Sequence, residues 1–379
     1  MTDGDIKNSG EISGGDGGGV QPGDQGGAGE SLKAASGPRV AVIVPNFNGS
    51  SYLGECLPSL LDQSYTNYSV TVVDNASSDD SVDVMRRDFP QVELLANSVN
   101  SGFAGGCNTG LKHALAGEAE YFVLVNSDTI ADRDWLAELV EVAQSDPRIG
   151  VCQSMIYLAD RPAMINSAGN EAHYLAFGYC GHYLEEDHGQ FTAAVDVPFA
   201  SGTSLLVKRA VIDEIGLMDE DLFLYQEDLD LSWRARLAGW RVVLAPASKI
   251  YHKYSFSRNQ MKFYYLERNR LLLLLQNYSP RSLAVLAPAF LGAEVAMIGY
   301  SLTGGWFKQK MRGYAWIAGH MGMVRDKRRR VQGQRHVSDA ELTSFWTDKM
   351  GFADLQDSPL TKIANPVSAA YWKIARKLL

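Results

Sequence analysis

Apolar and polar residues alternate in blocks along the first part of the chain. Four apolar runs have the length and the β-branched content of buried strands, and they occupy residues 40–44, 68–74, 92–97 and 121–125. Between the first two runs, apolar residues recur at helical spacing, at Leu53, Leu57, Leu60 and Leu61. Strands that alternate with helices in this way predict an α/β fold, with a mostly parallel sheet and helices on its faces.

Polar side chains follow these runs, where each strand should end. Asn46 and Asn48 follow the first run, Asp74 ends the second, and Asn126 and Asp128 follow the fourth. In parallel sheets, ligands bind outside the carboxyl ends of the strands. We therefore expect these five side chains at one ligand-binding edge of the sheet.

The pattern becomes mixed α and β between about residues 150 and 255. Strands are expected at 150–158, 200–209 and 240–252, and a helix at 228–239. Leu229, Trp233 and Leu237 recur at intervals of four, which predicts the buried face of that helix. Asp230 and Arg234 are expected to form an exposed i, i+4 ion pair.

Glu227 and Asp228 stand at the start of this helix. Carboxylates there complement the helix dipole, but two adjacent acids are more than a cap requires. One of them can act as a general base if the fold brings it near a substrate hydroxyl. His252 follows the last strand of the region. A lone histidine is commonly structural, but a neutral imidazole here could also complete a metal site with Asp128.

Asp128 suits a hard divalent cation, because it comes just past a buried strand at the ligand edge. Mg²⁺ or Mn²⁺ typically takes one or two protein carboxylates and completes its shell with diphosphate oxygens and water. Asn126 lies two residues earlier, on the same side of an extended chain. The alternative, that Asp128 only forms a turn, stays open on these residues.

Glycines are concentrated in residues 97–112, which predicts a turn where the backbone can approach a ligand closely. The dinucleotide-binding pattern G-x-G-x-x-G is absent. The spacing from Gly105 to Gly110 nearly matches the phosphate loop of NTPases. However, Leu111 stands where that loop requires lysine, and Lys112 comes one residue late. Both of these nucleotide-binding loops are therefore excluded.

The chain becomes helical from about residue 260, and residues 282–303 form an apolar stretch long enough to span a bilayer. Glu294 lies in its middle, where an unpaired carboxylate is costly, and Pro288 and Gly292 interrupt it. A full span, a re-entrant or interfacial hairpin and a buried helix all stay open, and we favour membrane contact without a full span. A basic cluster that could bind anionic headgroups, or form a solvated helix face, follows at Arg325, Lys327, Arg328, Arg329 and Arg330.

Composition narrows the class of protein. The chain has 379 residues, 46% hydrophobic and 21% charged, which is typical of a globular protein with one large or two ordinary domains. Its net charge of −9 argues against a general nucleic-acid binder. Its four cysteines lie far apart without a CxxC pair, which indicates a reducing compartment. The Gly- and Asp-rich residues 1–38 predict a disordered tail. Because no secretory signal is visible, we expect a cytoplasmic location.

Together these motifs resemble the inverting glycosyltransferases of family 2, which have the GT-A fold. The resemblance rests on the order and spacing of "VAVIVPNFNGSSYLGECLPSLLDQSY", "VTVVDNASSDDS", "NSGFAGGCNTG", "YFVLVNSDT", "ASGTSLLVKRAVIDEIGLMDEDLFLYQEDLDLSWRARLAGW" and "IYHKYS". Within the family, the chain looks most like the rhamnosyltransferase-type branch, which builds cell-surface polysaccharides. This divides the chain into a tail (1–38), a GT-A domain (39–260) and a helical, membrane-associated C-terminal region (261–379).

The resemblance implies a nucleotide-sugar site at the sheet edge. The implied donor-binding residues are Pro45, Asn46, Asn48, Asp74, Gly102, Asn108 and Asn126. Asp74 would accept a hydrogen bond from the N3–H group of a pyrimidine base.

The resemblance also implies a metal site and a catalytic pair. Asn126-Ser127-Asp128 would be a variant of the family's D-x-D motif, with Asn in place of the first Asp. Asp128 and His252 would hold Mg²⁺ or Mn²⁺. Asp228, beside Glu227, would deprotonate the acceptor hydroxyl.

The implied activity is the inverting transfer of one sugar from dTDP-rhamnose or a UDP-sugar to a hydroxyl of a glycan or polyprenyl-linked acceptor. The enzyme would work peripherally or monotopically at the inner face of the plasma membrane, and homo-oligomerisation stays open. A processive synthase is disfavoured, because the nearest match to its Gln-x-x-Arg-Trp motif begins at Gln309 and lacks the Trp. A nucleotidyltransferase would need a basic Gly-rich loop at the first strand, and "PNFNGSSY" is not one. The remaining alternative is a non-catalytic sugar-nucleotide-binding or membrane scaffold.

Overall fold

The computed structural model describes residues 37–254, 260–351 and 359–379. The predicted disordered tail, residues 1–38, lies almost wholly outside the described residues. The residues after this tail form one compact unit.

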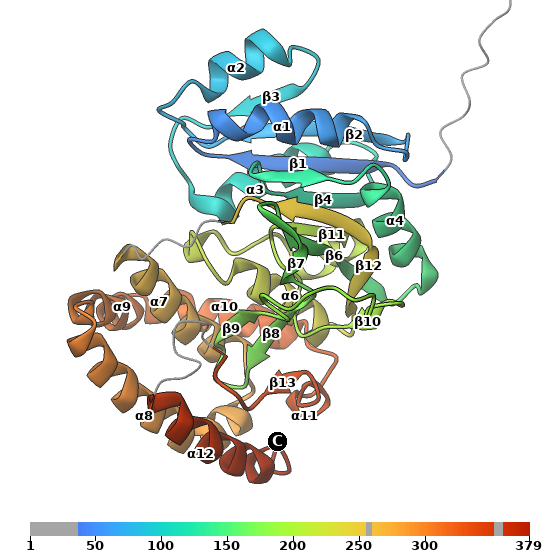
Figure 1. Cartoon of the computed structure of the whole chain (residues 1–379). Coiled ribbons are helices and arrows are strands. Elements are labelled where there is room, and N and C mark those ends of the chain that lie inside the picture. The colour runs from blue at the N-terminus through green and yellow to red at the C-terminus, as the bar shows by residue number, and fades with distance from the viewer. Residues whose placement is uncertain (1–36, 255–259, 352–358) are drawn as a thin grey trace, which may run out of the picture. The chain divides into compact units, whose positions relative to one another are not determined.

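A ten-stranded mixed sheet forms the centre of the fold and confirms the predicted α/β class (Figure 1). Four neighbouring strands are parallel, in the order β3 (Glu93–Ala96), β2 (Tyr68–Asp74), β1 (Val40–Asn46) and β4 (Tyr121–Val125). Next come β11 (Ser204–Lys208), antiparallel to both its neighbours, then β6 (Ile149–Leu158), β12 (Arg241–His252) and β10 (Val195–Asp196). Off this path, β5 (Thr129–Ala131) pairs with β12 and β7 (Arg161–Ser167) pairs with β6. A smaller sheet contains β13 (Trp346–Thr347), β8 (Asn170–His173) and β9 (Gly178–Cys180).

Helices cover both faces of the large sheet. They are α1 (Ser50–Leu61), α2 (Ser81–Asp88), α3 (Gly102–Leu115), α4 (Trp135–Ser145), α5 (Arg209–Ile215) and α6 (Glu227–Leu237), with a 3₁₀ turn at Glu220–Leu222. Alternate residues of β1 enter two different cores, because side chains of a strand point to opposite faces in turn. Val42 and Val44 pack in the core that contains Leu57 of α1. Ile43 packs in the core that contains Leu111 of α3.

Residues 102–107 of the glycine-rich stretch are helical rather than part of the predicted turn. Helix α3 begins at Gly102, so Gly105, Gly106 and Gly110 are helical. Glycine lowers helix propensity, but here it allows close packing. A Cβ at Gly110 would lie 2.4 Å from Cγ2 of Ile43 in β1. These glycines therefore bring α3 against the sheet, and only Gly102, with φ of +74°, needs glycine's backbone freedom.

The C-terminal region is helical, as predicted, and packs against α6 (Figure 1). Its helices are α7 (Gln260–Asn277), α8 (Pro280–Thr303), α9 (Phe307–Gly319), α10 (Met321–Gly333), α11 (Asp339–Leu342) and α12 (Pro359–Ala375). The predicted buried face of α6 is confirmed, since Leu229, Trp233 and Leu237 join the core shared with α7.

The prediction of an exposed Asp230–Arg234 pair is wrong, because α7 covers that side of α6. Both side chains are buried, and Arg234 Nε lies 2.7 Å from Asp230 Oδ2. Gln276 of α7 donates a hydrogen bond to Asp230 Oδ1 at 2.6 Å. Arg234 also donates to the carbonyl oxygens of Ile215 and Leu217. The pair is therefore buried and connects α6 by hydrogen bonds to α7 and to the end of α5.

The predicted basic headgroup-binding cluster is only partly exposed, because α10 packs against α7. Lys327 forms ion pairs with Asp219 and Asp221, the latter at 2.7 Å. Arg328 donates to the carbonyl oxygen of Tyr278 at 2.7 Å. These two side chains are therefore held by contacts with other elements, whereas Arg329 pairs at the surface with Asp326 of its own helix.

Candidate active site

Asn46 and Asp74 meet at the carboxyl edge of the sheet. They end β1 and β2 and are register partners, so their side chains emerge together. Asn46 Nδ2 lies 3.4 Å from Asp74 Oδ1, and the backbone N–H of Ser77 donates to Asp74 Oδ2 at 3.0 Å. Both side chains are buried. Pro45 precedes Asn46 in β1 and faces Gly106 of α3.

Asn48 braces the loop that follows β1 against the loop that follows β2. Its φ is +53°, a left-handed conformation that asparagine tolerates. Its Oδ1 accepts a hydrogen bond from the N–H of Ser78 at 2.8 Å. Its own N–H donates to Ser77 Oγ at 2.9 Å. The two loops beside Asp74 are therefore held at a fixed separation.

Asn75 organises the loop before α3, a role that sequence reasoning missed. Its Nδ2 donates to the carbonyl oxygen of Gly102 at 2.8 Å and to Asn100 Oδ1 at 3.1 Å. Its Oδ1 accepts from Asn97 Nδ2 and from the backbone N–H of Ser101. The signal available in the sequence was Asn75 itself, a second polar residue directly after Asp74.

Asp128 and His252 face each other across the site. β5, directly after Asp128, pairs antiparallel with the end of β12, so that Thr129 is the register partner of His252. The backbone N–H of Lys253 donates to the carbonyl oxygen of Asp128 at 2.9 Å. His252 Nε2 lies 3.3 Å from Asp128 Oδ1. The short strand β5 thus brings together two residues that are distant in sequence.

The tautomer of His252 suits metal binding. Its Nδ1 lies 2.9 Å from Asn166 Oδ1, which can only accept, so Nδ1 carries a proton. In the neutral ring, Nε2 then presents a lone pair toward the carboxylate of Asp128. Two electron-rich atoms at 3.3 Å favour a cation between or beside them, and an outer partner such as Asn166 commonly orients a metal-binding histidine. Within the described residues no group of three or more His, Cys, Asp or Glu is arranged to hold a metal ion.

The segment around Gly202 connects the acidic pair with the sheet edge that carries Asp128. The N–H of Gly202 donates to Asp228 Oδ2 at 3.0 Å. The next residue, Thr203, accepts a hydrogen bond from the N–H of Asn126 at 3.0 Å. Asp228 and the Asn126-Ser127-Asp128 segment are thus joined through two consecutive residues.

Three side-chain atoms of the predicted site residues are buried without a hydrogen-bond partner. They are Asn46 Oδ1, Asn126 Oδ1 and Glu227 Oε2. Such atoms are uncommon in native proteins and indicate a ligand or water site. All three belong to residues that the sequence placed in the site.

Glu227 and Asp228 lie at the start of α6, and both titrate above the ordinary range. Burial raises the pKa of Asp228, although hydrogen bonds from the N–H groups of Gly202 and Leu229 oppose this. Burial, followed by the neighbouring charge of Asp228, raises the pKa of Glu227 well above its usual value. A buried carboxylate with a raised pKa is a stronger proton acceptor once ionised.

The loop that presents this acidic pair has an unfavourable backbone. Phe223, Tyr225 and Gln226 all have φ between +63° and +69°, where residues with a Cβ are strained. The carbonyl oxygen of Phe223 accepts a hydrogen bond from the N–H of Ala104, which docks the loop on the start of α3. A Cβ at Gly102 would lie 2.2 Å from that same oxygen. Glycine at the start of α3 therefore permits the acidic pair to approach the sheet edge.

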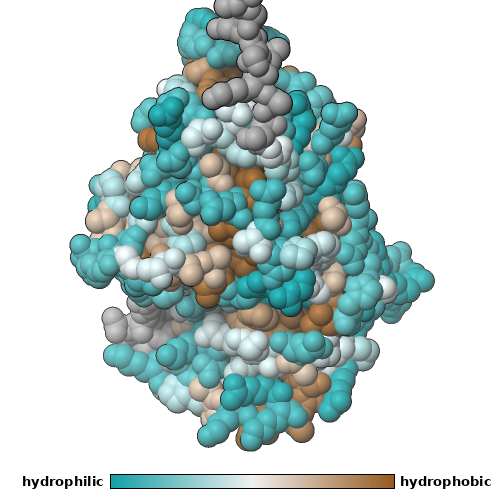
Figure 2. Space-filling view, turned by 90° about the vertical axis from the view of Figure 1, so that its right-hand side faces the viewer, coloured by the Kyte–Doolittle hydropathy of each residue, from teal (hydrophilic) through white to brown (hydrophobic). Residues whose placement is uncertain are grey.

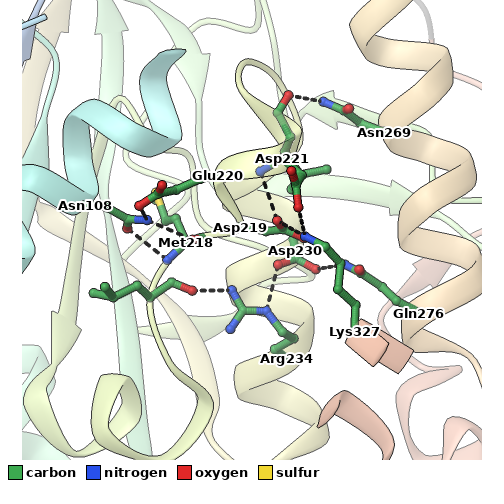
Figure 3. Close-up of polar contacts among 12 residues, drawn as sticks. Asn108, Met218, Asp219, Glu220, Asp221, Asp230, Arg234, Asn269, Gln276 and Lys327 are labelled. Carbon is green, nitrogen blue, oxygen red and sulfur yellow. Dashed lines mark hydrogen bonds and ion pairs between the residues drawn. The ribbon is translucent and has the colours of Figure 1, made fainter. Parts of the chain in front are cut away.

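Asn269 of α7 stabilises this strained loop and was also missed by sequence reasoning. Its Nδ2 contacts the carbonyl oxygens of Leu222, Leu224 and Tyr225 at 2.9, 3.0 and 2.7 Å. Arg268 donates to Asn269 Oδ1 and to the carbonyl oxygens of Asp221 and Leu222. Figure 3 shows Asn269 and Lys327 reaching this loop segment from the C-terminal helices. No local sequence signal marks Asn269, which lies in an ordinary-looking helix.

Asn108 is placed differently from the other predicted donor-binding residues. Its Nδ2 donates to the carbonyl oxygen of Met218 and to Glu220 Oε1, both at 2.9 Å. Its Oδ1 accepts from the N–H of Met218 (Figure 3). The side chain joins α3 to the segment before α6, and its hydrogen-bonding groups are occupied there.

Residues 38–271 match the family model described as "Glycosyltransferase like family 2". The chain belongs to glycosyltransferase family 2. The match spans the sheet, the candidate site and the first part of α7. The predicted enzyme class is thereby confirmed, and the glycosyltransferase carries its acidic pair and its Asn-Ser-Asp segment within the matched region.

Two curated relatives are similar to this glycosyltransferase. An N-acetylglucosaminyl-diphospho-decaprenol L-rhamnosyltransferase of Mycobacterium tuberculosis is 25% identical over 231 residues, which are 56% of this chain and 75% of the relative. A poly-beta-1,6-N-acetyl-D-glucosamine synthase of Staphylococcus aureus is 23% identical over 212 residues, which are 55% of this chain and 48% of the relative.

A solved structure supports the predicted GT-A architecture. GalNAc-T7 with UDP, GalNAc and Mn²⁺ superposes with a TM-score of 0.54 at 14% identity, covering 66% of this glycosyltransferase and 50% of that chain. At this identity the likeness concerns the fold alone.

Proposed function

We propose that this glycosyltransferase transfers one sugar, with inversion, from a pyrimidine nucleoside diphosphate donor to a hydroxyl of a lipid-linked glycan acceptor in cell-surface polysaccharide synthesis. The observation that carries the proposal is the hydrogen-bonded path from Asp228 through Gly202 and Thr203 to Asn126. It sets a carboxylate suited to proton transfer beside an edge suited to a diphosphate.

The donor would bind along the ends of β1, β2 and β4. Asp74 and the orphaned oxygen of Asn46 offer hydrogen-bond acceptors for a pyrimidine N–H or a ribose hydroxyl. The orphaned oxygen of Asn126, directly after β4, offers a further acceptor beside the proposed diphosphate position. Burial of all three groups excludes water and favours a fixed nucleotide orientation.

Asp128 and His252 would hold a divalent cation, Mg²⁺ or Mn²⁺. Since they supply only two ligands, diphosphate oxygens and water would complete the shell. The cation would neutralise charge that develops on the departing nucleoside diphosphate. The UDP and Mn²⁺ named with GalNAc-T7 are consistent with such a site on this fold.

Asp228 would take the proton from the acceptor hydroxyl as that oxygen attacks the anomeric carbon. Gly202 and Leu229 hold its two oxygens by backbone hydrogen bonds, which fixes the carboxylate. Attack from the face opposite the leaving group inverts the anomeric centre. Burial and the charge of Asp228 both raise the pKa of Glu227.

The acceptor would be carried on a polyprenyl lipid at the membrane surface. The relative named for decaprenol-linked substrate supports this class of acceptor. The long apolar helix α8 supports a membrane location for this chain.

The test combines donor binding with turnover. Purified full chain is mixed with dTDP, UDP or GDP in Mn²⁺, Mg²⁺ or EDTA, and the shift in Tm is measured. A ligand at 100 times its Kd stabilises by about 2.7 kcal/mol. We expect a metal-dependent shift with a pyrimidine diphosphate. Asp228→Asn should retain this shift but lose sugar transfer by about 10²–10⁴-fold. A well-folded chain that shifts with no nucleotide would refute the donor site, and unchanged transfer by Asp228→Asn would refute the base.

A further inference from the structure

Helix α8 exposes apolar residues and buries polar ones, which is the reverse of a helix on the surface of a soluble protein. Its exposed positions recur every three or four residues and carry only apolar side chains or glycine over five turns: Ala284, Pro288, Leu291, Gly292, Val295, Ala296, Gly299 and Leu302. The exposed fractions of Leu291, Val295 and Leu302 are 62%, 73% and 60%. Its buried residues are mostly polar, namely Ser282, Glu294 and Ser301 with Leu286. We call the exposed set the α8 stripe.

A core helix does not account for this arrangement. A helix of equal hydropathy in a soluble core is mostly buried, whereas only 17% of the most apolar window of α8 is buried. By contrast, the face in Figure 2 is mostly hydrophilic, with hydrophobic residues in small groups. A continuous exposed apolar stripe of this length marks an interaction surface.

The inward side of α8 is fixed by an ionic cluster. Glu294 pairs with Arg270 of α7 and with Lys310 of α9, the latter at 2.9 Å, and accepts a hydrogen bond from Tyr314. Glu267 of α7 pairs with Arg270 and Lys310 at 3.1 and 2.5 Å. Burial by itself raises the pKa of Glu294, but these cations and Tyr314 outweigh it, and its pKa falls to about 2. The carboxylate at the middle of α8 is therefore charged and satisfied within the protein.

This cluster also decides the orientation of α8 in a membrane. If α8 crossed a bilayer, Arg270 and Lys310 would lie at its midplane together with α7 and α9. Yet Asn269, the neighbour of Arg270, contacts the carbonyl oxygens of Leu222 and Tyr225 in the loop that presents the acidic pair. Spanning would thus submerge a loop of the site proposed for a water-soluble nucleotide donor, so the stripe fits a membrane only when α8 lies in its plane.

Helix α12 adds a second apolar stripe with a basic border. Its exposed apolar residues are Val367, Ala370 and Ile374, and its exposed basic residues are Lys362 and Lys373. The turn that follows the helix adds Arg376, Lys377 and Leu378, all exposed. Tyr371 donates its hydroxyl to the carbonyl oxygen of Val285, which joins α12 to α8. Figure 1 shows α12 beside the first part of α8.

Charge separates along the chain in the sense an anionic membrane requires. Residues 260–379 contain 18 Lys and Arg against 8 Asp and Glu, whereas residues 1–259 contain 17 against 36. A basic segment is attracted to anionic headgroups, and the acidic remainder is repelled from them. This asymmetry selects a lipid surface over a second copy of the same stripe, which would bring like charges together.

We propose that α8 and α12 form an in-plane docking surface for an anionic lipid bilayer. The stripes enter the acyl boundary, the basic residues of α12 and of the turn after it contact headgroups, and the catalytic domain stays in water. This proposal rests on the membrane location proposed above and makes it more specific. Its test measures membrane binding and needs no measurement of sugar transfer.

Vesicle binding tests the surface. Full-length protein is sedimented with vesicles of phosphatidylglycerol and phosphatidylcholine, or of phosphatidylcholine alone. We expect the anionic vesicles to bind more strongly, and Leu291→Gln with Val295→Gln to weaken binding by about tenfold or more. The control, Leu184→Gln with Val195→Gln, changes two exposed apolar residues of the catalytic domain and should bind as wild type. Each variant must keep its nucleotide-induced Tm shift, which separates a failed surface from a failed donor site.

Depth measurements test the orientation. Single cysteines at Ala284, Val295 and Leu302, in a Cys180→Ser background, are labelled with a fluorophore and quenched by lipids with a spin label near the headgroup or deep in the acyl chain. In-plane binding predicts the same shallow depth at all three positions. A deep value at Val295 with shallow values at the ends would overturn the orientation. Equal vesicle binding by the stripe variant and wild type would overturn the surface. Light scattering that shows a dimer abolished by the stripe variant would instead assign the stripe to a second copy.

Discussion

His252 Nε2 lies 3.3 Å from Asp128 Oδ1, while the other ring nitrogen of His252 is held by Asn166. The pairing of β5 with β12 creates this contact. It gives the candidate site a place for positive charge at the strand end that the sequence singled out.

The proposed metal site predicts that changing either ligand removes the metal-dependent part of nucleotide binding. Asp128→Asn and His252→Gln should each remove the Mn²⁺-dependent part of the Tm shift with a pyrimidine diphosphate, because each removes one of the two proposed protein ligands. Asp74→Asn is the contrasting variant and should weaken nucleotide binding with and without metal. The shift is measured in Mn²⁺ and in EDTA. A His252→Gln protein that keeps the full metal-dependent shift would contradict the assignment.

The raised pKa of Asp228 predicts the acid limb of the pH–rate profile. A general base must be ionised, and burial raises the pKa of Asp228 above the ordinary aspartate value. Turnover should therefore fall as pH drops through that raised value, well before an exposed aspartate would protonate. The profile of kcat/KM is measured with saturating metal. An acid limb at or below the ordinary aspartate pKa would count against Asp228 as the base.

Asn269 is expected to act as a positioning residue. Asn269→Asp keeps the size of the side chain but removes the donors that satisfy the carbonyl oxygens of the strained loop. Because the loop presents Asp228, kcat should fall about tenfold or more, while the nucleotide-induced Tm shift is retained. The readouts are kcat and donor KM, measured well below the Tm of the variant.

The matched control for Asn269 is Asn277→Asp. It changes the same residue type in the same helix, also fully buried, but Asn277 contacts Asp230 rather than the loop. It should lower stability with little change in kcat. Equal losses of kcat in the two variants would show that α7 has only a general structural role.

His173 predicts a pH dependence of stability. Burial lowers the pKa of His173 from 6.5 to about 3, and its Nε2 contacts Ser368 of α12. Between these two pH values the unfolded chain binds a proton that the folded chain does not, so stability rises with pH in this window and is complete above it. His173→Gln should flatten this part of the profile, measured by urea unfolding at several pH values. The exposed His188→Gln serves as control, and a flattened profile there would contradict the explanation.

Gly110 predicts a packing effect. A Cβ there would lie 2.4 Å from Ile43, so Gly110→Ala should destabilise the protein by about 1–3 kcal/mol despite its better helix propensity. Gly322→Ala in α10 meets no atom within 4 Å and should be neutral or stabilising. Urea unfolding of both variants makes the comparison, and a stabilised Gly110→Ala would show that α3 can move away from β1.

The main strands and helices, and the edge at which we expect the ligand, follow from the pattern of apolar and polar residues. Strand and helix periods are local properties, and the rule that ligands bind at the carboxyl ends of parallel strands places Asn46, Asp74 and Asp128 without further information. For the same reason, the buried face of α6 through Trp233 was readable from spacing alone.

Only the tertiary structure decided which distant residues meet. Asp128 lies beside His252 because of a three-residue strand that is too short to predict. Asn269 and Lys327 contact the loop before α6 from helices whose sequences carry no local signal of this contact. Asp230 and Arg234 were expected to be exposed because a helix period cannot reveal that a second helix covers the polar side. The same holds for α8, where apolar composition gave the membrane tendency, but the ionic cluster around Glu294 decided which side faces outward. Long-range packing sets burial. Burial determines whether a charged side chain stays in water or needs a partner within the protein.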